Sequence, residues 1–301
     1  MINERRAFGF ALTAVLLWST VATAFKLTLT AFTPVQMLTV ASTLSVLTLG
    51  ILCFMQGKLK QVVPTFTARP LYFLLLGLIN PLAYYLILFK AYTLLPASLA
   101  QPINYSWAVT LTIMAALFLG QKIRKQDWLA CLLGYSGVVI IATKGHLLSL
   151  HFDNPLGVGL ALLSTLLWAG YWILNAKNTA DPLVSVLLGF SLALPFAVAL
   201  TLYEGAGWPS ALSKWAAVSY VGLFEMGITF VLWLTALKST RNTSRISNLI
   251  FVSPFISLFL LAQIIGETIH PSTISGLFLI ISGLVVQQLQ FPTLRFFTKR
   301  L

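Results

Sequence analysis

One acidic residue, Glu225, lies at the middle of a long apolar stretch, where a carboxyl group is costly to bury. Its chemistry suits two functional roles, because it can exchange a proton or bind the ammonium group of a substrate. A structural interpretation stays open, in which a neutral carboxylic acid bonds to a neighbouring helix. The chain contains an internal repeat, described below, and an offset of 145 residues makes Asn80 the counterpart of Glu225. Two polar residues therefore occupy the same depth of two apolar stretches.

Tryptophan is usually enriched at membrane interfaces, yet Trp18, Trp107 and Trp168 each fall near the middle of an apolar stretch. An indole N–H at that depth needs a partner. These residues and their aromatic neighbours predict a cavity that suits an apolar or aromatic solute; alternatively, bulky aromatics simply fill helix interfaces. The predicted aromatic wall consists of Trp18, Tyr84, Tyr105, Trp107, Trp168 and Trp172.

Two asparagines accompany prolines inside apolar stretches, Asn80 before Pro81 and Asn104 two residues after Pro102. A proline removes a helical hydrogen bond and frees a carbonyl group, which in a membrane needs a partner from protein or from a watery cavity. We therefore expect Asn80 and Asn104 to line a cavity near the bilayer midplane. The alternative is a packed bundle whose prolines only bend the helices.

Two lysines, Lys26 and Lys90, lie near the ends of apolar stretches and can simply extend to the lipid headgroups. Lys90 is the better candidate for binding a substrate carboxylate, because it follows Tyr84 on the same expected helix.

The sequence argues against an enzyme. Gly134 to Gly137 (Gly-Tyr-Ser-Gly) matches the short motif around the serine of intramembrane proteases, but that chemistry needs a histidine base, and the three histidines fall in expected outer loops. Small residues that let helices approach closely explain the motif instead. Phosphate-binding loops and metal-ligand spacings are missing, and both cysteines lie in apolar runs, so we expect no cofactor and no metal.

Composition identifies a helical membrane protein. The 301 residues are 58% hydrophobic and 9% charged, whereas soluble domains carry about 25% charged residues. The positive residues behind the net charge of +12 lie in loops between apolar spans, as is typical of membrane proteins. The charge is therefore explained by the lipid bilayer, and we expect no nucleic-acid partner.

Ten apolar spans can be counted, and each is long enough for a hydrocarbon core of about 30 Å. They cover about 7–28, 34–55, 70–94, 96–119, 127–144, 157–177, 183–203, 215–237, 246–265 and 271–290. With the N-terminus inside, fifteen Lys and Arg residues fall at inner ends and four at outer ends. The positive-inside rule therefore predicts that both termini are cytoplasmic.

The chain repeats itself. Leu16-Leu17-Trp18 matches Leu166-Leu167-Trp168 at an offset of 150, and Gly120-Gln121 parallels Gly266-Glu267 at an offset of 146. Five spans per copy is an odd number, so the second copy must have the opposite topology. The prediction is an all-α membrane protein with two inverted five-helix repeats, 1–150 and 151–301, and with substrate bound between them near the midplane.

These motifs resemble the EamA branch of the drug/metabolite transporter superfamily, whose halves carry a Leu-Trp pattern in the first helix and a Gly-Glu step before the last. The first half departs from this pattern with Gly120-Gln121, and it lacks the usual arginine in its second span. The stretches Asn104-Tyr105-Ser106-Trp107 and Gly120-Gln121-Lys122 look like the aromatic amino acid exporters of this superfamily.

The resemblance implies an exporter in the bacterial inner membrane with a central, largely apolar cavity. We therefore expect a secondary transporter that exports amino acids, neutral or aromatic, by alternating access. The alternative within this fold is a broad-specificity exporter of drugs, nucleobases or metabolites. A different class of function would be a membrane scaffold or an intramembrane enzyme. The internal repeat and the missing set of catalytic residues argue against both.

Overall fold

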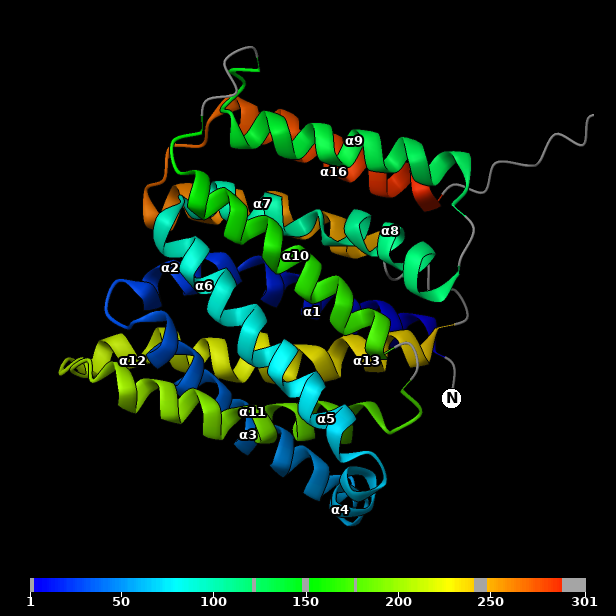
Figure 1. The fold of residues 1–301 in the computed structure, drawn as a ribbon, viewed down its shortest axis with the longest axis vertical. Coiled ribbons are helices and arrows are strands. Elements are labelled where there is room, and N and C mark those ends of the chain that lie inside the picture. Colours follow the sequence, from blue (N-terminus) through cyan, green and yellow to red (C-terminus); the bar gives the residue numbers. More distant parts are fainter. Residues whose placement is uncertain (1–2, 121–122, 148–151, 176–177, 241–247, 289–301) are drawn as a thin grey trace, which may run out of the picture.

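The computed structural model describes residues 3–120, 123–147, 152–175, 178–240 and 248–288, and within these ranges every regular element is a helix (Figure 1). In chain order they are α1 (Glu4–Ser19), α2 (Val21–Leu29), α3 (Pro34–Met55), α4 (Leu59–Ala68), α5 (Pro70–Gly77), η1 (Leu78–Ala83), α6 (Tyr84–Leu94), α7 (Ala97–Tyr105), α8 (Trp107–Leu119), α9 (Lys125–Ala142), α10 (Pro155–Asn175), α11 (Pro182–Glu204), α12 (Leu212–Tyr220), η2 (Val221–Ile228), α13 (Thr229–Ser239), η3 (Asn248–Val252), α15 (Ser253–Leu260), η4 (Leu261–Ile265) and α16 (Pro271–Gln288).

Among the described residues, seven continuous helical ranges are long and apolar enough to cross a membrane. They agree with seven of the predicted spans to within a few residues: Glu4–Leu29, Pro34–Met55, Pro70–Leu94, Ala97–Leu119, Pro155–Asn175, Pro182–Glu204 and Leu212–Trp233. Leu249–Ile265 and Pro271–Gln287 are shorter apolar helices at two further predicted spans. The protein is therefore a multi-pass membrane protein.

Several of these ranges are interrupted near their middle. The range Pro70–Leu94 breaks at Asn80, whose backbone is extended (φ −142°, ψ 116°), which confirms the break predicted at Asn80-Pro81. The helix pair α7 and α8 meets at Ser106, and η2 is a π-helical stretch that contains Glu225. Backbone groups freed at such breaks need other partners in a membrane.

Helices α3 and α11 pack side by side in opposite directions. The hydroxyls of Thr39 and Thr201 lie 2.7 Å apart, and at the other end Lys58 Nζ lies 2.8 Å from Asp181 Oδ2. Burial disfavours the charged Asp181 carboxylate, but the Lys58 ammonium and the backbone N–H groups of Val184 and Leu183 outweigh it and lower the pKa of Asp181.

Helices α9 and α16 form a second antiparallel pair along one edge of the molecule (Figure 1). Their backbones approach at glycines, because a Cβ on Gly276 would lie 2.6 Å from the carbonyl oxygen of Gly137, and a Cβ on Gly283 would lie 2.8 Å from that of Ala130. This is the close packing that small residues permit between membrane helices.

The remaining long helices pair across the two halves of the chain. Tyr72 at the start of α5 donates from its hydroxyl to Leu174 O at the end of α10, at 3.0 Å. Helix α1 runs against α13, since Asn3 N donates to Ser239 O at 2.8 Å, and α2 runs against α12, where the hydroxyls of Thr20 and Tyr220 lie 2.7 Å apart.

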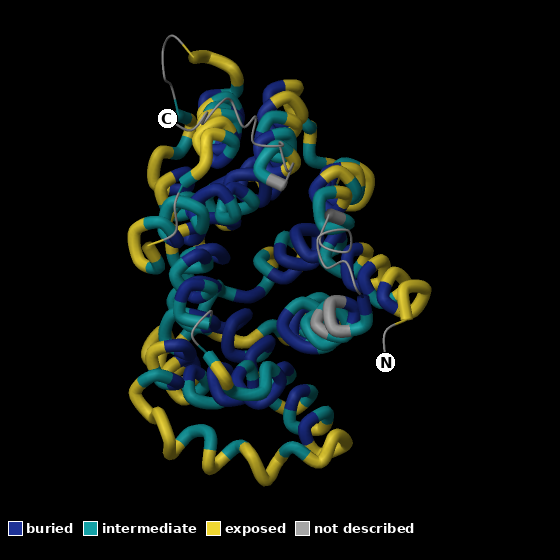
Figure 2. Tube along the Cα trace, turned by 90° about the vertical axis from the view of Figure 1, so that its right-hand side faces the viewer, coloured by how far each residue is buried: buried dark blue, intermediate teal, exposed yellow. Residues whose placement is uncertain are grey.

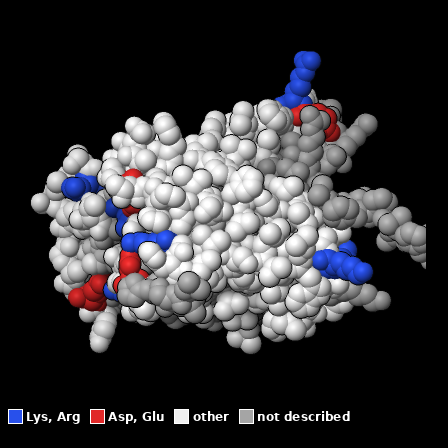
Figure 3. Space-filling model, turned by 90° about the horizontal axis from the view of Figure 1, so that it is seen from above, with Lys and Arg blue, Asp and Glu red and all other residues white. Residues whose placement is uncertain are grey.

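The surface has the pattern of a membrane protein. Large apolar side chains are exposed on many helices, for example Leu71 (80%), Leu117 (74%) and Leu202 (77%). Exposed residues alternate with buried ones along the outer helices in Figure 2. In Figure 3 the charged residues lie towards the two ends of the visible face, with a broad uncharged band between them.

The connection between the second and third predicted spans contains a short helix, α4. Its residues are all exposed or half-buried, and Val62 and Phe66 pack against the core. An amphipathic helix of this kind suits a membrane interface.

Candidate functional site

A cavity of about 450 Å³ lies between helices from both halves of the chain. It sits where α1 meets α2, where α7 meets α8, and beside η2. Its described lining consists of Trp18, Val21, Phe25, Tyr84, Leu88, Tyr92, Gln101, Asn104, Tyr105, Trp107, Ala108, Leu111, Trp168, Trp172, Glu225, Phe230, Trp233, Ile250, Phe251, Leu284 and Gln287.

Trp168 stands at the centre of the aromatic wall. Its ring centroid lies 4.6 Å from that of Tyr84, 6.0 Å from that of Trp172 and 6.3 Å from that of Trp107. On another side Trp18 contacts Phe230 at 5.8 Å, edge to face. These contacts hold the rings at fixed angles, so they offer a substrate both ring faces and ring edges.

Polar bonds fix the tyrosine and asparagine side chains of the wall. Asn104 Nδ2 donates to Ser164 Oγ at 2.8 Å, and the Tyr84 hydroxyl donates to Asn104 Oδ1 at 3.4 Å. The Tyr105 hydroxyl donates to Ser253 Oγ at 3.1 Å. The partners Ser164 and Ser253 belong to α10 and α15, so these bonds also tie the two halves of the chain together.

The Glu225 carboxyl group reaches the cavity from η2. Its Oε1 accepts a hydrogen bond from the Tyr85 hydroxyl at 3.2 Å, and the Trp18 indole also interacts with it. Its Oε2 is buried and has no hydrogen-bond partner among the described residues. A buried acceptor without a partner is costly. A hydrogen-bond donor on a substrate, or protonation of the carboxyl group, would remove this cost.

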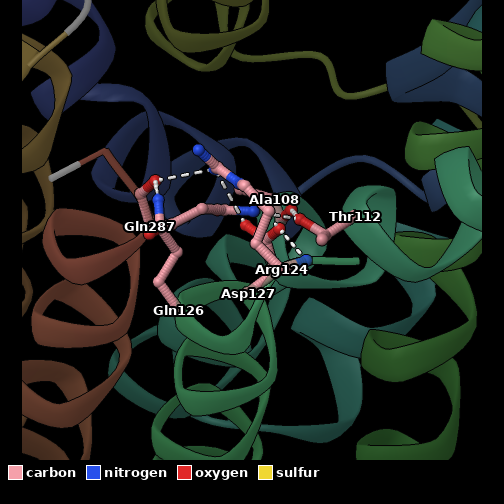
Figure 4. Close-up of polar contacts among 6 residues, drawn as sticks. All are labelled: Ala108, Thr112, Arg124, Gln126, Asp127 and Gln287. Atoms are coloured by element: carbon pink, nitrogen blue, oxygen red, sulfur yellow. Dashed lines mark hydrogen bonds and ion pairs between the residues drawn. The ribbon is translucent and has the colours of Figure 1, made fainter. Parts of the chain in front are cut away.

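A second hollow of about 670 Å³ adjoins the cavity and shares Trp107, Trp172 and Gln287 with it. A polar cluster lies on its wall, at the start of α9 and the end of α16 (Figure 4). Arg124 donates to both carboxylate oxygens of Asp127 at 3.1 Å and to Gln287 O at 3.2 Å, and the Gln287 side chain donates to Thr112 Oγ1.

At the opposite end, the turn between α6 and α7 is held from two sides. Lys26 Nζ donates to the carbonyl oxygens of Tyr92 and Leu95 at 2.8 Å each, at the C-terminal end of α6. The Glu267 carboxylate accepts from Ala97 N and Ser98 N at 2.9 Å each, at the start of α7. A cation at a helix C-terminus and an anion at an N-terminus both stabilise the helices.

Seven of the eight residues predicted to bind substrate line the cavity: Trp18, Tyr84, Asn104, Tyr105, Trp107, Trp168 and Trp172. Glu225 lines it as well. Asn80 does not; it is 4% exposed and lies beside Tyr171, where α5 packs closely on α11. Lys90 is exposed on α6 and is not part of the described lining.

The sequence reasoning missed the other residues of the lining, among them the polar or large side chains of Gln101, Trp233 and Gln287. Helical periodicity could have found Gln101, because it precedes Asn104 by three residues and so shares its helix face. Trp233 and Gln287 carried no such signal. Within the part of the chain that the structure describes, no group of three or more His, Cys, Asp or Glu side chains could hold a metal.

Comparison with known proteins gives one family. The family model of the EamA-like transporter family matches the chain twice, over residues 5–143 and 155–287. The chain is 26% identical over 253 residues to the aromatic amino acid exporter YddG of Ancylobacter novellus, covering 83% of this chain and 85% of that protein.

Other relatives agree on transport. An uncharacterized transporter of Bacillus subtilis, YvbV, is 25% identical over 222 residues, covering 71% of this chain and 70% of that protein. A crystal structure matches with a TM-score of 0.65 at 21% identity, covering 95% of this chain and 97% of that chain. That match shows the fold alone.

Proposed function

Because the chain belongs to the EamA-like transporter family, and so is a membrane transporter and not an enzyme, we propose that it exports amino acids that are neutral or aromatic. The observation that carries this proposal is the cavity itself. Its aromatic wall matches the side chain of such a substrate, and Glu225 is a carboxyl group placed to meet an ammonium group or a proton.

Two inverted five-helix repeats, 1–150 and 151–301, make up the proposed architecture. The double family match supports the repeat. The packing supports the inversion, because α3 is antiparallel to α11 and α9 is antiparallel to α16, and these are equivalent helices of the two copies. Inverted repeats of this kind bind substrate near the midplane between the copies.

The proposed location is the bacterial inner membrane with both termini in the cytoplasm, as the distribution of Lys and Arg favours. In this orientation the second hollow lies on the cytoplasmic side, and the contacts of Lys26 and Glu267 close the outer side. We propose that this arrangement is the inward-open one and that rocking one repeat against the other would open the outer end.

The substrate would lie between Trp18, Tyr84, Trp107 and Trp168. Glu225 would bind the ammonium group of the substrate or carry a proton in exchange for it. The Tyr85 hydroxyl, on a residue that is 1% exposed, holds one carboxyl oxygen in place, and the other oxygen is buried without a partner among the described residues.

The test is efflux of a panel of labelled amino acids from proteoliposomes, with and without a pH gradient, for the wild type and Glu225→Gln. We expect amino-acid flux that responds to the gradient and loses this response in the variant. Flux that ignores both the gradient and the substitution would make the protein a facilitator with a structural Glu225. No flux for any amino acid would refute amino-acid export and favour a broad-specificity exporter.

A further inference from the structure

We infer that the cavity recognises the ammonium group of its substrate but not the carboxylate, so that arylalkylamines and amino-acid amides are ligands of the same site. This inference rests on the proposed function and narrows its substrate class. It follows from which charged and polar groups face the cavity and which are engaged elsewhere.

The described lining of the cavity contains negative charge and no positive charge. Of its 21 described lining residues, Glu225 is the single Asp, Glu, Lys, Arg or His. The rest of the wall is dominated by aromatic rings, whose faces attract cations. A carboxylate together with aromatic faces is the combination that binds organic ammonium groups, and it repels a second carboxylate.

Two residues of the lining, Glu225 and Gln101, each have one buried side-chain oxygen without a partner among the described residues, Oε2 of Glu225 and Oε1 of Gln101. Gln101 is 5% exposed, so water cannot easily satisfy its oxygen from outside the cavity. An ammonium group has three N–H donors and no acceptor, so it can satisfy oxygens of this kind. A carboxylate offers them nothing.

The described basic residues around the cavity are engaged elsewhere or point away. Arg124, on the wall of the adjoining hollow, pairs with Asp127 and Gln287 (Figure 4). Lys26 donates to two backbone carbonyl groups, and Lys90 is exposed outside the described lining. A buried carboxylate without a cation is costly, so a substrate carboxylate would gain little here.

A buried donor of the lining is placed to meet the other end of the substrate. The Trp172 indole N–H has no hydrogen-bond partner among the described residues, and Trp172 lines both hollows. A neutral N–H can donate to the carbonyl oxygen of an amide, although its bond to a carboxylate is stronger. An amide in place of the carboxylate should therefore keep this bond.

The test uses isothermal titration of the purified full-length protein in nanodiscs with four matched ligands, each titrated separately: L-phenylalanine, L-phenylalaninamide, phenethylamine and 3-phenylpropionate. We expect the amide and the amine to bind at least as tightly as phenylalanine. We expect 3-phenylpropionate, which lacks the amino group, to bind at least tenfold more weakly than phenylalanine.

Two variants identify the groups involved. Gln101→Leu should weaken phenethylamine and phenylalanine by the same factor, because both present an ammonium group. Arg124→Gln should leave phenylalanine binding within about threefold of the wild type. Loss of phenylalanine binding in this variant, with phenethylamine binding unchanged, would show that Arg124 binds the substrate carboxylate and would overturn the inference.

The ligand series separates the two proposals. If phenylalanine binds and phenethylamine does not, the carboxylate is required, and the inference fails while amino-acid export stands. If the amine and the amide bind and phenylalanine does not, the inference is supported and export of phenylalanine-like amino acids fails. If none of the four binds, the inference is refuted, and the efflux panel then decides whether other amino acids are exported.

Discussion

Replacing Glu267 by glutamine should loosen the outer end of the cavity. The carboxylate accepts two backbone N–H groups, from Ala97 and Ser98, at the start of α7. A glutamine has one oxygen and one NH₂ group, so it can accept only one of these bonds, and its NH₂ faces the other N–H. The residue before α7, Pro96, supplies no side-chain cap of its own.

The size of the effect follows from the lost bond. A hydrogen bond to a charged group contributes about 1.5–3 kcal/mol. If the outer-closed arrangement alone contains this bond, its loss shifts the equilibrium towards the outer-open arrangement by about 10- to 150-fold. Glu267 is only partly buried, so we expect the lower end of this range.

Thiol labelling measures this shift. A cysteine at Val21, which lines the cavity on the helix that leads to Lys26, would be introduced after Cys53 and Cys131 are replaced by alanine. In right-side-out vesicles, a membrane-impermeant thiol reagent should label this cysteine about tenfold faster when Glu267 is glutamine.

A second glutamate at the same end provides the control. Glu204 accepts from the Thr33 hydroxyl at 2.6 Å but is exposed and does not line the cavity. Glu204→Gln should leave the labelling rate unchanged, since an amide oxygen can still accept from a hydroxyl. Equal rates for wild type and Glu267→Gln, with both correctly folded, would show that this contact does not close the outer end.

Three further predictions concern other parts of the molecule. Gly276→Ala should lower the stability of the detergent-purified protein by about 1–3 kcal/mol through overpacking against α9, whereas Gly159→Ala, with open space around it, should not; thermal unfolding measures both. Trp168→Ala should reduce amino-acid efflux at least tenfold at normal expression, while Trp128→Ala, 61% exposed, should leave efflux unchanged. Asp181 has a lowered pKa, so its ion pair with Lys58 stabilises the fold above about pH 4, by about 0.2–1 kcal/mol, and this stabilisation is lost as the pH falls further. Asp181→Asn keeps a helix cap but removes the charge, so it should abolish the part of the change in unfolding stability between pH 6 and pH 3 that this ion pair causes.

The residues that the sequence singles out and that line the cavity are those that are unusual for their depth. A tryptophan or a carboxyl group at the middle of an apolar span has few explanations in a membrane, so the amino-acid sequence alone singles out Trp18, Trp168 and Glu225. The break at Asn80-Pro81 is predictable for a related reason, since proline cannot continue the helical hydrogen bonds.

The direction in which side chains point could not be predicted from the sequence. Lys90 was chosen because it follows Tyr84 on the same helix, but residues six positions apart do not share a helix face, and neighbouring helices decide which face meets the cavity. The extended backbone at Asn80 adds a further rotation between α5 and α6. Asn80 itself is therefore buried beside Tyr171, away from the described lining.

The equivalent positions of the proposed repeats show how a symmetric scaffold can hold an asymmetric substrate. Both third spans lose regular α-helical geometry at the same depth, at η1 around Asn80 and at η2 around Glu225. In the first copy the polar residue is packed inside protein, whereas in the second it faces the cavity with one free carboxyl oxygen. A single carboxyl group, rather than a symmetric pair, gives the cavity one end that attracts an ammonium group. Such polarity orients a substrate with one amino group and one aromatic ring, and a strictly symmetric cavity could not provide it.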